Sequence, residues 1–279
     1  MTQPPFTKHL NKMKTDCLLT VSIVTFKPNL AELKSTLESL VEALTRFDPA
    51  LIGITLIDNS PVDTVSPLLK SVLQGWNFTF IHGQGNVGFG HGHNFALSGL
   101  GQYHLILNPD IELAPDALVN AVQFLQENPS CGLLSPYATW PDGRRQYLCK
   151  RFPSVFDLLL RGFAPKIIRG LFSARLKHYE MYHETQNEIF WNPPIISGCF
   201  MFFRGTTLRE TGGFDPRYFL YFEDFDLSIR CAKLADIAYV PTIKIIHAGG
   251  HASRKGAWHI RQFARSAARF YAIHGYKFI

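Results

Sequence analysis

The regular alternation of β-branched segments with helical patterns is the feature that most restricts what this chain can fold into. Residues 18–25 form a short β-branched run that predicts a strand, and after Pro28 apolar residues recur at helical spacing. The two patterns then repeat, with strands predicted at 51–57, 78–82 and 103–107 and helices at 66–73, 94–100 and 115–127. Strands that alternate with helices form a mainly parallel sheet covered by helices on both faces. We therefore predict an α/β fold.

The second half of the chain has a less regular pattern. A strand is expected at 131–135, and Pro141-Asp142-Gly143 is a turn that can join two short strands. Further on, the pattern predicts strands at 198–203 and 238–246 and helices at 206–211, 223–234 and 257–273. No repeat or low-complexity linker divides the sequence. We expect one domain over 1–279, with a regular half at 18–135, a smaller mixed half at 136–256 and a terminal helix at 257–279.

The overall composition favours a folded protein that binds anionic partners. With 46% hydrophobic residues the chain can bury a sizeable core, and only 18% of it is charged, below the usual share of roughly 25%. Lys and Arg outnumber Asp and Glu by 28 to 22. This excess suits phosphate-bearing ligands or an anionic membrane surface.

The cysteines and the apolar segments indicate a cytoplasmic protein. The 5 cysteines are scattered, without a Cys-x-x-Cys pair, which indicates neither a disulfide framework nor a zinc-cysteine site. The first 15 residues contain no apolar run of signal-peptide type. No stretch approaches the roughly 18 apolar residues that span a bilayer. Any membrane contact is therefore expected to be peripheral.

The segment 151–177 combines aromatic and aliphatic bulk with cations, and Asp157 is its single acid. Such a composition is typical of an interfacial segment that lies on anionic lipid. An ordinary basic helix packed on the domain explains it as well. Both interpretations stay open at this point.

Polar side chains follow the predicted parallel strands at their carboxyl ends, where open α/β sheets bind ligands. Thr25, Asp58 and Asn108 lie at such ends. A carboxylate at Asp110, just beyond Asn108, can bind a hard cation that also chelates a diphosphate. Asn, Pro and Asp are also common turn residues. Their position at the strand ends is what favours a functional role.

The segment Gly83 to Gly88 formally matches the dinucleotide-binding fingerprint, with Asp110 following at a later strand end. A Rossmann oxidoreductase must therefore be considered. That fingerprint, however, belongs to the first strand-helix turn of a nucleotide-binding half, and here two strands and two helices precede it. The glycines of 83–92 more simply describe a turn that needs backbone freedom or close ligand approach.

Three carboxylates gather at the start of the helix predicted at 223–234: Glu223, Asp224 and Asp226. The helix dipole favours acids there, so helix-end stabilisation is one explanation. Several aromatic residues surround them, however, and crowded acids in apolar surroundings are costly and have separated pKa values. This pattern favours a functional cluster.

The histidines near the end of the mixed half do not form a zinc motif. An alanine and two glycines separate His247 from His251, and the two glycines argue against the helical arrangement of zinc enzymes. One histidine that completes a magnesium or manganese site is the more plausible role.

Taken together, these motifs resemble inverting family-2 glycosyltransferases of the GT-A type, particularly bacterial rhamnosyltransferases of O-antigen and polysaccharide assembly. The resemblance runs from Val21 to about His251, and the order and spacing of its blocks make it specific. The blocks are Val21-Ser22-Ile23-Val24-Thr25, Asp58-Asn59-Ser60, Asn86-Val87-Gly88-Phe89-Gly90, Leu107-Asn108-Pro109-Asp110, Ser197-Gly198-Cys199-Phe200-Met201, Gly212-Gly213-Phe214-Asp215, Tyr221 to Leu227, and His247.

The resemblance implies a role for each site residue. Asp224 matches the general base, with Glu223 beside it, and Asp110 would ligate Mg²⁺ or Mn²⁺ with His247 as a further ligand or diphosphate contact. The first position of the family's Asp-x-Asp element is Asn108 here, so one negative charge is missing. The residues implied in donor binding are Thr25, Asp58, Asn86, Gly88, Asn94, Asn108 and Asp110.

The resemblance also implies substrates and a location. Lys150-Arg151-Phe152-Pro153-Ser154 looks like the rhamnosyltransferase pattern and favours L-rhamnose from dTDP-L-rhamnose as the donor. The acceptor would be a saccharide hydroxyl on a polyprenyl diphosphate, at the inner face of the cell membrane, with no nucleic acid as partner. The alternatives are a UDP-hexose-dependent transferase of the same fold, a Rossmann NAD-dependent oxidoreductase and a non-catalytic sugar-binding or nucleotide-binding module.

Overall fold

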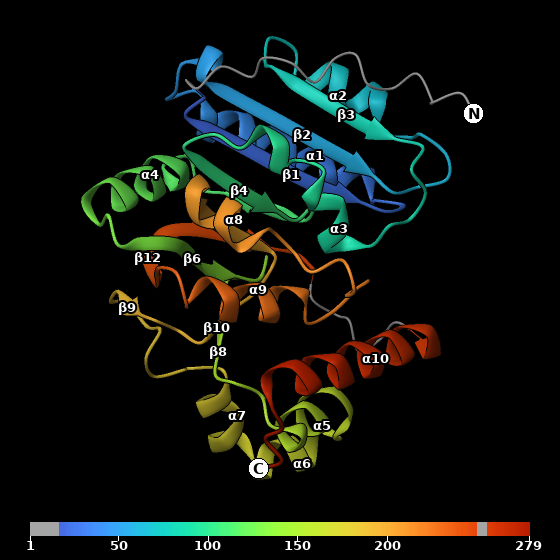
Figure 1. The fold of residues 1–279 in the computed structure, drawn as a ribbon, viewed down its shortest axis with the longest axis vertical. Coiled ribbons are helices and arrows are strands. Elements are labelled where there is room, and N and C mark those ends of the chain that lie inside the picture. Colours follow the sequence, from blue (N-terminus) through green and yellow to red (C-terminus); the bar gives the residue numbers. More distant parts are fainter. Residues whose placement is uncertain (1–16, 250–255) are drawn as a thin grey trace.

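A ten-stranded mixed sheet forms the centre of the computed structural model, which describes residues 17–249 and 256–279 (Figure 1). Its first half is parallel, as predicted, in the order β3-β2-β1-β4. The register pairs Thr25 with Asp58, and Asp58 with His82, so the carboxyl ends of three strands meet at one edge. These strands are β1 (Leu19–Thr25), β2 (Ile52–Asp58), β3 (Phe78–His82) and β4 (Tyr103–Leu107).

The helices of this half are α1 (Leu30–Leu44), α2 (Ser66–Val72), α3 (Phe89–Asn94) and α4 (Ala117–Glu127). The side chain of Asn29 accepts a hydrogen bond from the N–H of Ala31 and so caps α1, whose apolar stripe is buried. The sequence prediction is wrong at α3, because the helix lies at 89–94 and a 3-10 turn at 97–99 follows it.

The glycines within α3 explain why the pattern failed there. Glycine disfavours helices, so the segment read as a turn. A Cβ atom at Gly90 would come within 2.8 Å of Phe214, and one at Gly92 within 2.9 Å of Val24. Close packing of α3 on β1 and on the loop at Phe214 therefore requires glycine at both positions.

The second half adds antiparallel strands to the same sheet. β11 (Phe200–Arg204) runs antiparallel to β4 and to β6 (Cys131–Thr139), and β12 (Asp236–His247) is parallel to β6. β5 (Ile111–Leu113) pairs with β12 and has only three residues, too few for a periodic pattern to reveal. β7 (Arg145–Gln146) pairs with β6 and β9 (Phe190–Trp191) pairs with β12, while β8 (Cys149–Lys150) and β10 (Ile195–Ile196) form a separate two-stranded sheet.

The segment 151–177 folds mainly into short helices, α5 (Val155–Phe163), α6 (Lys166–Leu171) and the start of α7 (Ser173–Tyr179). Figure 1 shows them with α10 (Gly256–His274) at the end of the molecule remote from β1, β2 and β3. Leu158 of α5 is buried in a cluster with Phe270 of α10. Ile167 and Leu171 of α6, in contrast, are 81% and 79% exposed. The segment thus packs internally along one part and leaves apolar side chains exposed along another.

The remaining helices are α8 (Gly205–Thr211) and α9 (Glu223–Cys231), which begins at the predicted residue. Across residues 17–249 and 256–279, no helix has both the length and the apolar character needed to cross a bilayer.

Candidate functional site

The ends of β1 and β2 hold a carboxylate with one unused oxygen. Oδ1 of Asp58 accepts hydrogen bonds from Thr25 Oγ1 at 3.0 Å, from the Ser60 N–H at 3.1 Å and from Ser60 Oγ at 2.6 Å. Oδ2 of Asp58 is buried and has no hydrogen-bond partner in the described part of the chain. Because an unpaired buried acceptor is costly, this oxygen suits a ligand N–H group.

The glycine-rich turn joins this edge to the loop before α9. The side-chain amide of Asn59 donates to the carbonyl of Gly88 at 3.1 Å, and the Gly88 N–H donates to Oδ1 of Asn86 at 3.1 Å. Gly88 has a φ of 91°, and a Cβ atom there would lie 2.3 Å from the carbonyl oxygen of Phe219. Only glycine allows this approach.

Asn94 contacts the protein with both ends of its amide. Its Nδ2 donates to the carbonyl of Phe214 at 2.7 Å, and its Oδ1 accepts from the Phe214 N–H at 2.9 Å. These contacts fix α3 against the loop at 213–215. The role of Asn94 in donor binding stays a prediction. The two hydrogen bonds that it makes are those of a residue that positions α3.

Beyond β4, two buried side-chain oxygens lie close together in the sequence. Oδ1 of Asn108 and Oδ1 of Asp110 both lack a hydrogen-bond partner among the described residues. The N–H of Asn108 donates to the carbonyl of Cys199 at 2.9 Å, which ties this segment to the start of β11. Two unpaired oxygens at a ligand-binding edge are the kind of group that a hard cation takes.

His247 is brought to Asp110 by the pairing of β12 with β5, in which it lies opposite Ile111. Its Nε2 is 3.6 Å from Oδ1 of Asp110. Its Nδ1 lies 2.8 Å from Oε1 of Gln146, and Nε2 of Gln146 donates to the His247 carbonyl at 2.7 Å. Because that Gln146 oxygen is an acceptor, Nδ1 carries the proton and the lone pair of Nε2 faces Asp110.

The chain leaves very little room around Asp110. The Ala248 N–H donates to the backbone carbonyl of Asp110 at 3.0 Å. A Cβ atom at Gly249 would lie 1.8 Å from Oδ2 of Asp110. Gly249 therefore has to be glycine for the carboxylate to keep its position.

These residues fit a divalent cation that has further ligands from a substrate. Burial lowers the pKa of His247, although Asp110 opposes the effect, so the imidazole is neutral and able to ligate. In the ranges 17–249 and 256–279, no group of three or more His, Cys, Asp or Glu side chains is placed to hold a metal. Mg²⁺ and Mn²⁺ commonly take one or two protein ligands and complete their shell with water and phosphate oxygens.

Asp224 lies in the first turn of α9 with both oxygens hydrogen-bonded to backbone. Its Oδ2 accepts from the Gly198 N–H at 2.8 Å, and its Oδ1 from the Phe225 N–H at 3.0 Å. Burial raises its pKa from 3.8 to about 6, while these two hydrogen bonds and the charge of Arg161 act to lower it. A carboxylate of this pKa can accept a proton near neutral pH.

Glu223 and Asp226 lie in the same turn as Asp224 but differ from it. Burial, followed by the charge of Asp224, raises the pKa of Glu223 well above its usual range. Of this coupled pair, Asp224 carries the charge because backbone N–H groups solvate it. Asp226 instead pairs with Arg230 Nε and with His274 Nε2, each at 2.8 Å, and its role is structural.

Gly198 and Cys199 connect the segment of Asn108 and Asp110 to Asp224, because the Cys199 carbonyl accepts from the Asn108 N–H and the Gly198 N–H donates to Asp224. Burial raises the pKa of the Cys199 thiol to about 12, and the charges of Asp110 and Asp224 both add to the rise. The thiol is therefore within electrostatic reach of both carboxylates. The structure thus brings together Asn108, Asp110, His247, Glu223 and Asp224, predicted from segments far apart in the sequence.

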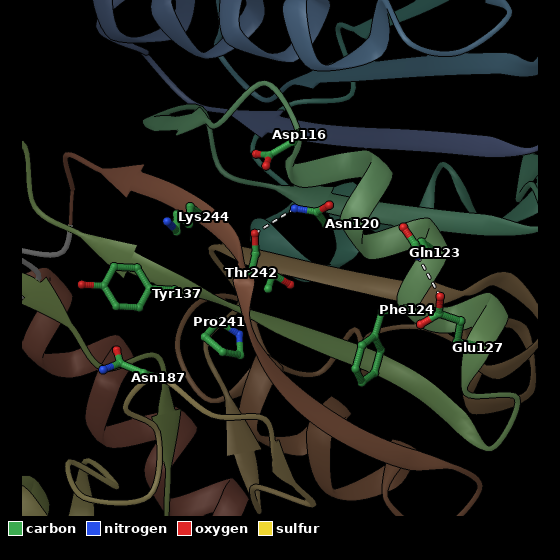
Figure 2. Close-up of a pocket in the computed structure, with 10 residues that line it drawn as sticks. All are labelled: Asp116, Asn120, Gln123, Phe124, Glu127, Tyr137, Asn187, Pro241, Thr242 and Lys244. Carbon is green, nitrogen blue, oxygen red and sulfur yellow. Dashed lines mark hydrogen bonds between the residues drawn. The ribbon is translucent and has the colours of Figure 1, made fainter.

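A pocket of about 740 Å³ lies elsewhere, between α4 and β12 (Figure 2). Lys244 lines it, and since Lys244 and His247 are three residues apart on one strand, their side chains point to opposite faces. This pocket is therefore separate from the site around Asp110.

Sequence reasoning missed three residues that support the site: Gln146, Gly198 and Gly249. Gln146 has no local signal, because its partner His247 is 101 positions away. Gly198 occurs in a recognised block, but its hydrogen bond to Asp224 is not visible in a pattern. The pair of glycines after His247 was read only as evidence against a helix.

The model of the family described as "Glycosyl transferase family 2" matches residues 20–212. N-acetylglucosaminyl-diphospho-decaprenol L-rhamnosyltransferase of Mycobacterium tuberculosis is 26% identical over 271 residues, which cover 91% of this chain and 84% of that protein. Rhamnosyltransferase WbbL of Escherichia coli K12 is 28% identical over 221 residues, covering 73% of this chain and 79% of WbbL.

Solved structures show a similar fold. GalNAc-T7 with UDP, GalNAc and Mn²⁺ superposes with a TM-score of 0.63 at 18% identity, and covers 83% of this chain. The mannosyltransferase PcManGT of Pyrobaculum calidifontis, in complex with GDP-Man and Mn²⁺, gives a TM-score of 0.58 at 18% identity over 90% of this chain. The chain spans 43% and 64% of those two proteins.

Proposed function

Because this chain belongs to glycosyl transferase family 2, we propose that it transfers L-rhamnose from dTDP-L-rhamnose to a hydroxyl group of a lipid-linked saccharide, in cell-surface polysaccharide synthesis. The proximity of Asp110 and Asp224 carries the proposal: the Cys199 carbonyl accepts a hydrogen bond from the N–H of Asn108, two residues before Asp110, and the adjacent Gly198 N–H donates to Asp224. The two rhamnosyltransferases support the sugar, and the mycobacterial relative, named for N-acetylglucosaminyl-diphospho-decaprenol, supports the class of acceptor.

The chemical step assigned to Asp224 is proton removal. The acceptor oxygen bonds to the anomeric carbon while the bond from that carbon to the diphosphate oxygen breaks. The hydroxyl proton passes to the Asp224 carboxylate, and the electron pair of the broken bond leaves with the nucleoside diphosphate. Attack on the face opposite the leaving group inverts the anomeric centre.

Asp110 and His247 are proposed to hold Mg²⁺ or Mn²⁺. The bound cation would neutralise the charge that develops on the leaving diphosphate. Gln146 keeps the His247 ring oriented for this task, and Gly249 keeps the space that the Asp110 carboxylate occupies. Asn108 contributes a neutral oxygen where a second carboxylate would add charge.

Donor recognition is proposed for the edge of β1 and β2 and for the glycine-rich turn. The unused oxygen of Asp58 suits the imide N–H of thymine and of uracil equally well. A UDP-hexose donor is therefore the second candidate. Thr25 orients Asp58, and Asn86, Gly88 and Asn94 shape the turn beside it.

The basic aromatic segment 151–177 is proposed to lie on the anionic inner face of the cell membrane, where a polyprenyl-linked acceptor is found. The exposed apolar residues Ile167 and Leu171 of α6 alternate with the cations Lys166 and Arg169. Lipid tails and anionic headgroups complement such a surface.

A donor screen tests the proposal. Polyprenyl-diphosphate-linked N-acetylglucosamine would be incubated with dTDP-rhamnose, UDP-glucose, UDP-galactose or UDP-N-acetylglucosamine, with Mn²⁺, Mg²⁺ or EDTA. We expect cation-dependent transfer from dTDP-rhamnose. Transfer from a UDP-sugar alone would replace the proposed donor, and activity that is unchanged in EDTA would remove the role given to Asp110 and His247.

A further inference from the structure

Two cations share one carboxylate next to the proposed base. Lys150 Nζ lies 3.6 Å and Arg161 Nε 3.3 Å from the same oxygen, Oε1 of Glu180. The side chain of Lys150 is only 6% exposed, whereas that of Arg161 is 50% exposed. Lys150, Arg161 and Glu180 together therefore carry one excess positive charge, and Lys150 is the buried cation of the group.

Two other arginines of this region are balanced, in contrast to this excess. Arg151 pairs with Glu184, and Arg175 Nε lies 2.6 Å from Oδ1 of Asp157. Each of these arginines has an acid of its own. In the described part of the chain, Lys150 and Arg161 both form their ion pair with the same acid, Glu180.

The strand pair β8–β10 connects this charge to the base. Lys150 of β8 lies opposite Ile195 of β10, three residues before Gly198, whose N–H group holds Asp224. Arg161, from α5, is close enough to Asp224 to act on its pKa. The cations thus lie beside the base, on a different set of elements from Asp110 and His247.

Burying Lys150 without a full counter-charge is unfavourable in the free protein. Burial lowers the pKa of Lys150 to about 8, and the charge of Glu180 only partly opposes that effect. A bound anion would remove this cost, because charge-assisted hydrogen bonds to phosphate oxygens are strong. A buried, under-neutralised cation close to a proposed catalytic group is a candidate anion site.

We propose that Lys150 and Arg161 bind the diphosphate of the lipid-linked acceptor. This inference rests on the proposed function. In a sugar linked to a lipid diphosphate, a single ring separates the accepting hydroxyl from the phosphate on its anomeric carbon. With the hydroxyl at Asp224, that phosphate must lie about one sugar ring away, on the acceptor side of the base.

The route of the lipid chain agrees with this position. Arg161 lies on α5, two residues after the exposed Leu159, and α5 leads directly to α6 with its exposed Ile167 and Leu171. The lipid would run from the two cations onto this apolar surface. The base, the diphosphate site and the membrane surface would then lie in one line.

The test compares two acceptors in detergent solution: farnesyl-diphosphate-linked N-acetylglucosamine and octyl N-acetylglucosaminide, which has no diphosphate. The variants are Arg161→Gln and Lys150→Gln, both checked for folding by circular dichroism. Arg144→Gln is the matched control, because Arg144 Nε also pairs with a single acid, Asp142, at 2.7 Å but on an exposed turn.

We expect Arg161→Gln and Lys150→Gln to raise the KM for the diphosphate acceptor about tenfold, the loss of one charged hydrogen bond. The KM for the neutral glycoside should stay within twofold, and Arg144→Gln should change neither value. Because Arg161 also acts on Asp224, a fall in kcat common to both acceptors is a separate effect and does not count as support.

Two outcomes would overturn the inference. One is an equal change in KM for both acceptors, and the other is a wild-type enzyme that does not prefer the diphosphate acceptor. If the wild-type enzyme binds and hydrolyses dTDP-rhamnose yet transfers to neither acceptor, the proposed acceptor itself fails, and the inference fails with it. Failure of the proposed donor would be recognised earlier, from the absence of any dTDP-rhamnose turnover.

Discussion

At the residue scale, Asp224 and Glu223 show how backbone hydrogen bonds separate two adjacent carboxyl groups. Burial raises the pKa of both, but Asp224 accepts the N–H groups of two other residues, Gly198 and Phe225, whereas Glu223 has a backbone hydrogen bond to its own N–H. Oε2 of Glu223 is buried without a partner among the residues that the structure describes. The proton of the pair therefore stays on Glu223, and Asp224 is left charged, as the proposed base must be.

The first prediction concerns pH. Because Asp224 must be deprotonated to accept a proton and its pKa is about 6, we expect kcat/KM to fall tenfold per pH unit below about pH 6. A pH–rate profile of the transfer reaction measures this. A profile that stays flat to pH 4.5 would show that a different group takes the proton.

The second prediction concerns Asp224→Asn. This variant should bind the donor normally but lose at least about 100-fold in kcat, because asparagine cannot accept the proton. The folded state also binds the Asp224 proton more tightly than the unfolded chain, so the wild-type protein loses stability as pH rises from 3.8 to about 6. Asp224→Asn should therefore melt at a higher temperature at pH 8, with a smaller gain at pH 4.5.

The control for Asp224→Asn is Asp142→Asn, an exposed acid paired with Arg144. It should change neither kcat nor the pH dependence of melting. Near-normal turnover by Asp224→Asn would exclude Asp224 as the base.

The third prediction concerns Gly249→Ala. The added methyl group would lie 1.8 Å from Oδ2 of Asp110, so the carboxylate must move out of its position. We expect Gly249→Ala to match Asp110→Ala in losing Mn²⁺-dependent nucleotide binding, measured by calorimetry with dTDP. Gly170→Ala is the control, because a Cβ atom there meets nothing within 4 Å among the described residues. Normal Mn²⁺ dependence in Gly249→Ala would contradict the assignment of Asp110.

The site residues at strand ends could be predicted from the sequence, whereas the residues that hold them in position could not. Thr25 and Asp58 end apolar strands and Asp110 follows one, and parallel pairing brings such strand ends together. Gln146 reaches His247 across 101 positions, and no periodic pattern encodes such a contact. The clearance that Asp110 needs at Gly249 likewise depends on how two distant strands meet.

At the element scale, α9 begins where the acids predicted it, and its third acid fixes it to α10. Asp226 accepts from Arg230 within α9 and from His274 of α10, and is almost fully buried. The sequence pattern predicted both helices but not the bond between them, because it gives no information on which helices pack together. The pattern missed α3, which is rich in glycine, and β5, which has three residues, because the local patterns of both elements are weak.

The fourth prediction follows from this link. Asp226→Asn leaves the Arg230 charge without a carboxylate and weakens the contact of α9 with α10, which should cost about 1–3 kcal/mol. The melting temperature should fall by several degrees, while donor affinity measured well below that temperature stays normal. A variant as stable as the wild-type protein would show that the pair adds nothing to stability.

At the scale of the whole molecule, the polar site and the exposed apolar surface of α6 are connected through α5, which carries Arg161. Figure 1 shows α5, α6 and α10 gathered at one end of the molecule. The composition of 151–177 predicted a basic, apolar segment, and the structure divides it into a packed part and an exposed part. Contacts between distant segments, such as that of Leu158 with Phe270, separate the two parts.

The fifth prediction tests this surface. Ile167→Ser combined with Leu171→Ser should reduce co-sedimentation with vesicles of anionic phospholipid at least about fivefold, because two exposed side chains lose their lipid contact. Raising the salt concentration should weaken the binding of the wild-type protein. Val62→Ser is the control, since Val62 is 67% exposed in the loop between β2 and α2. Equal binding of the double variant would place the membrane contact elsewhere.

The position of β11 between β4 and β6 has a consequence for synthesis of the protein. On the ribosome, β4 is complete long before β11 emerges, so the parallel half exists for a time with β4 as an open edge. An uncovered strand edge is a template for pairing with other chains. Residues 17–135 expressed alone would keep that edge permanently. The nascent chain should therefore depend on chaperones to avoid aggregation until its own later strand arrives.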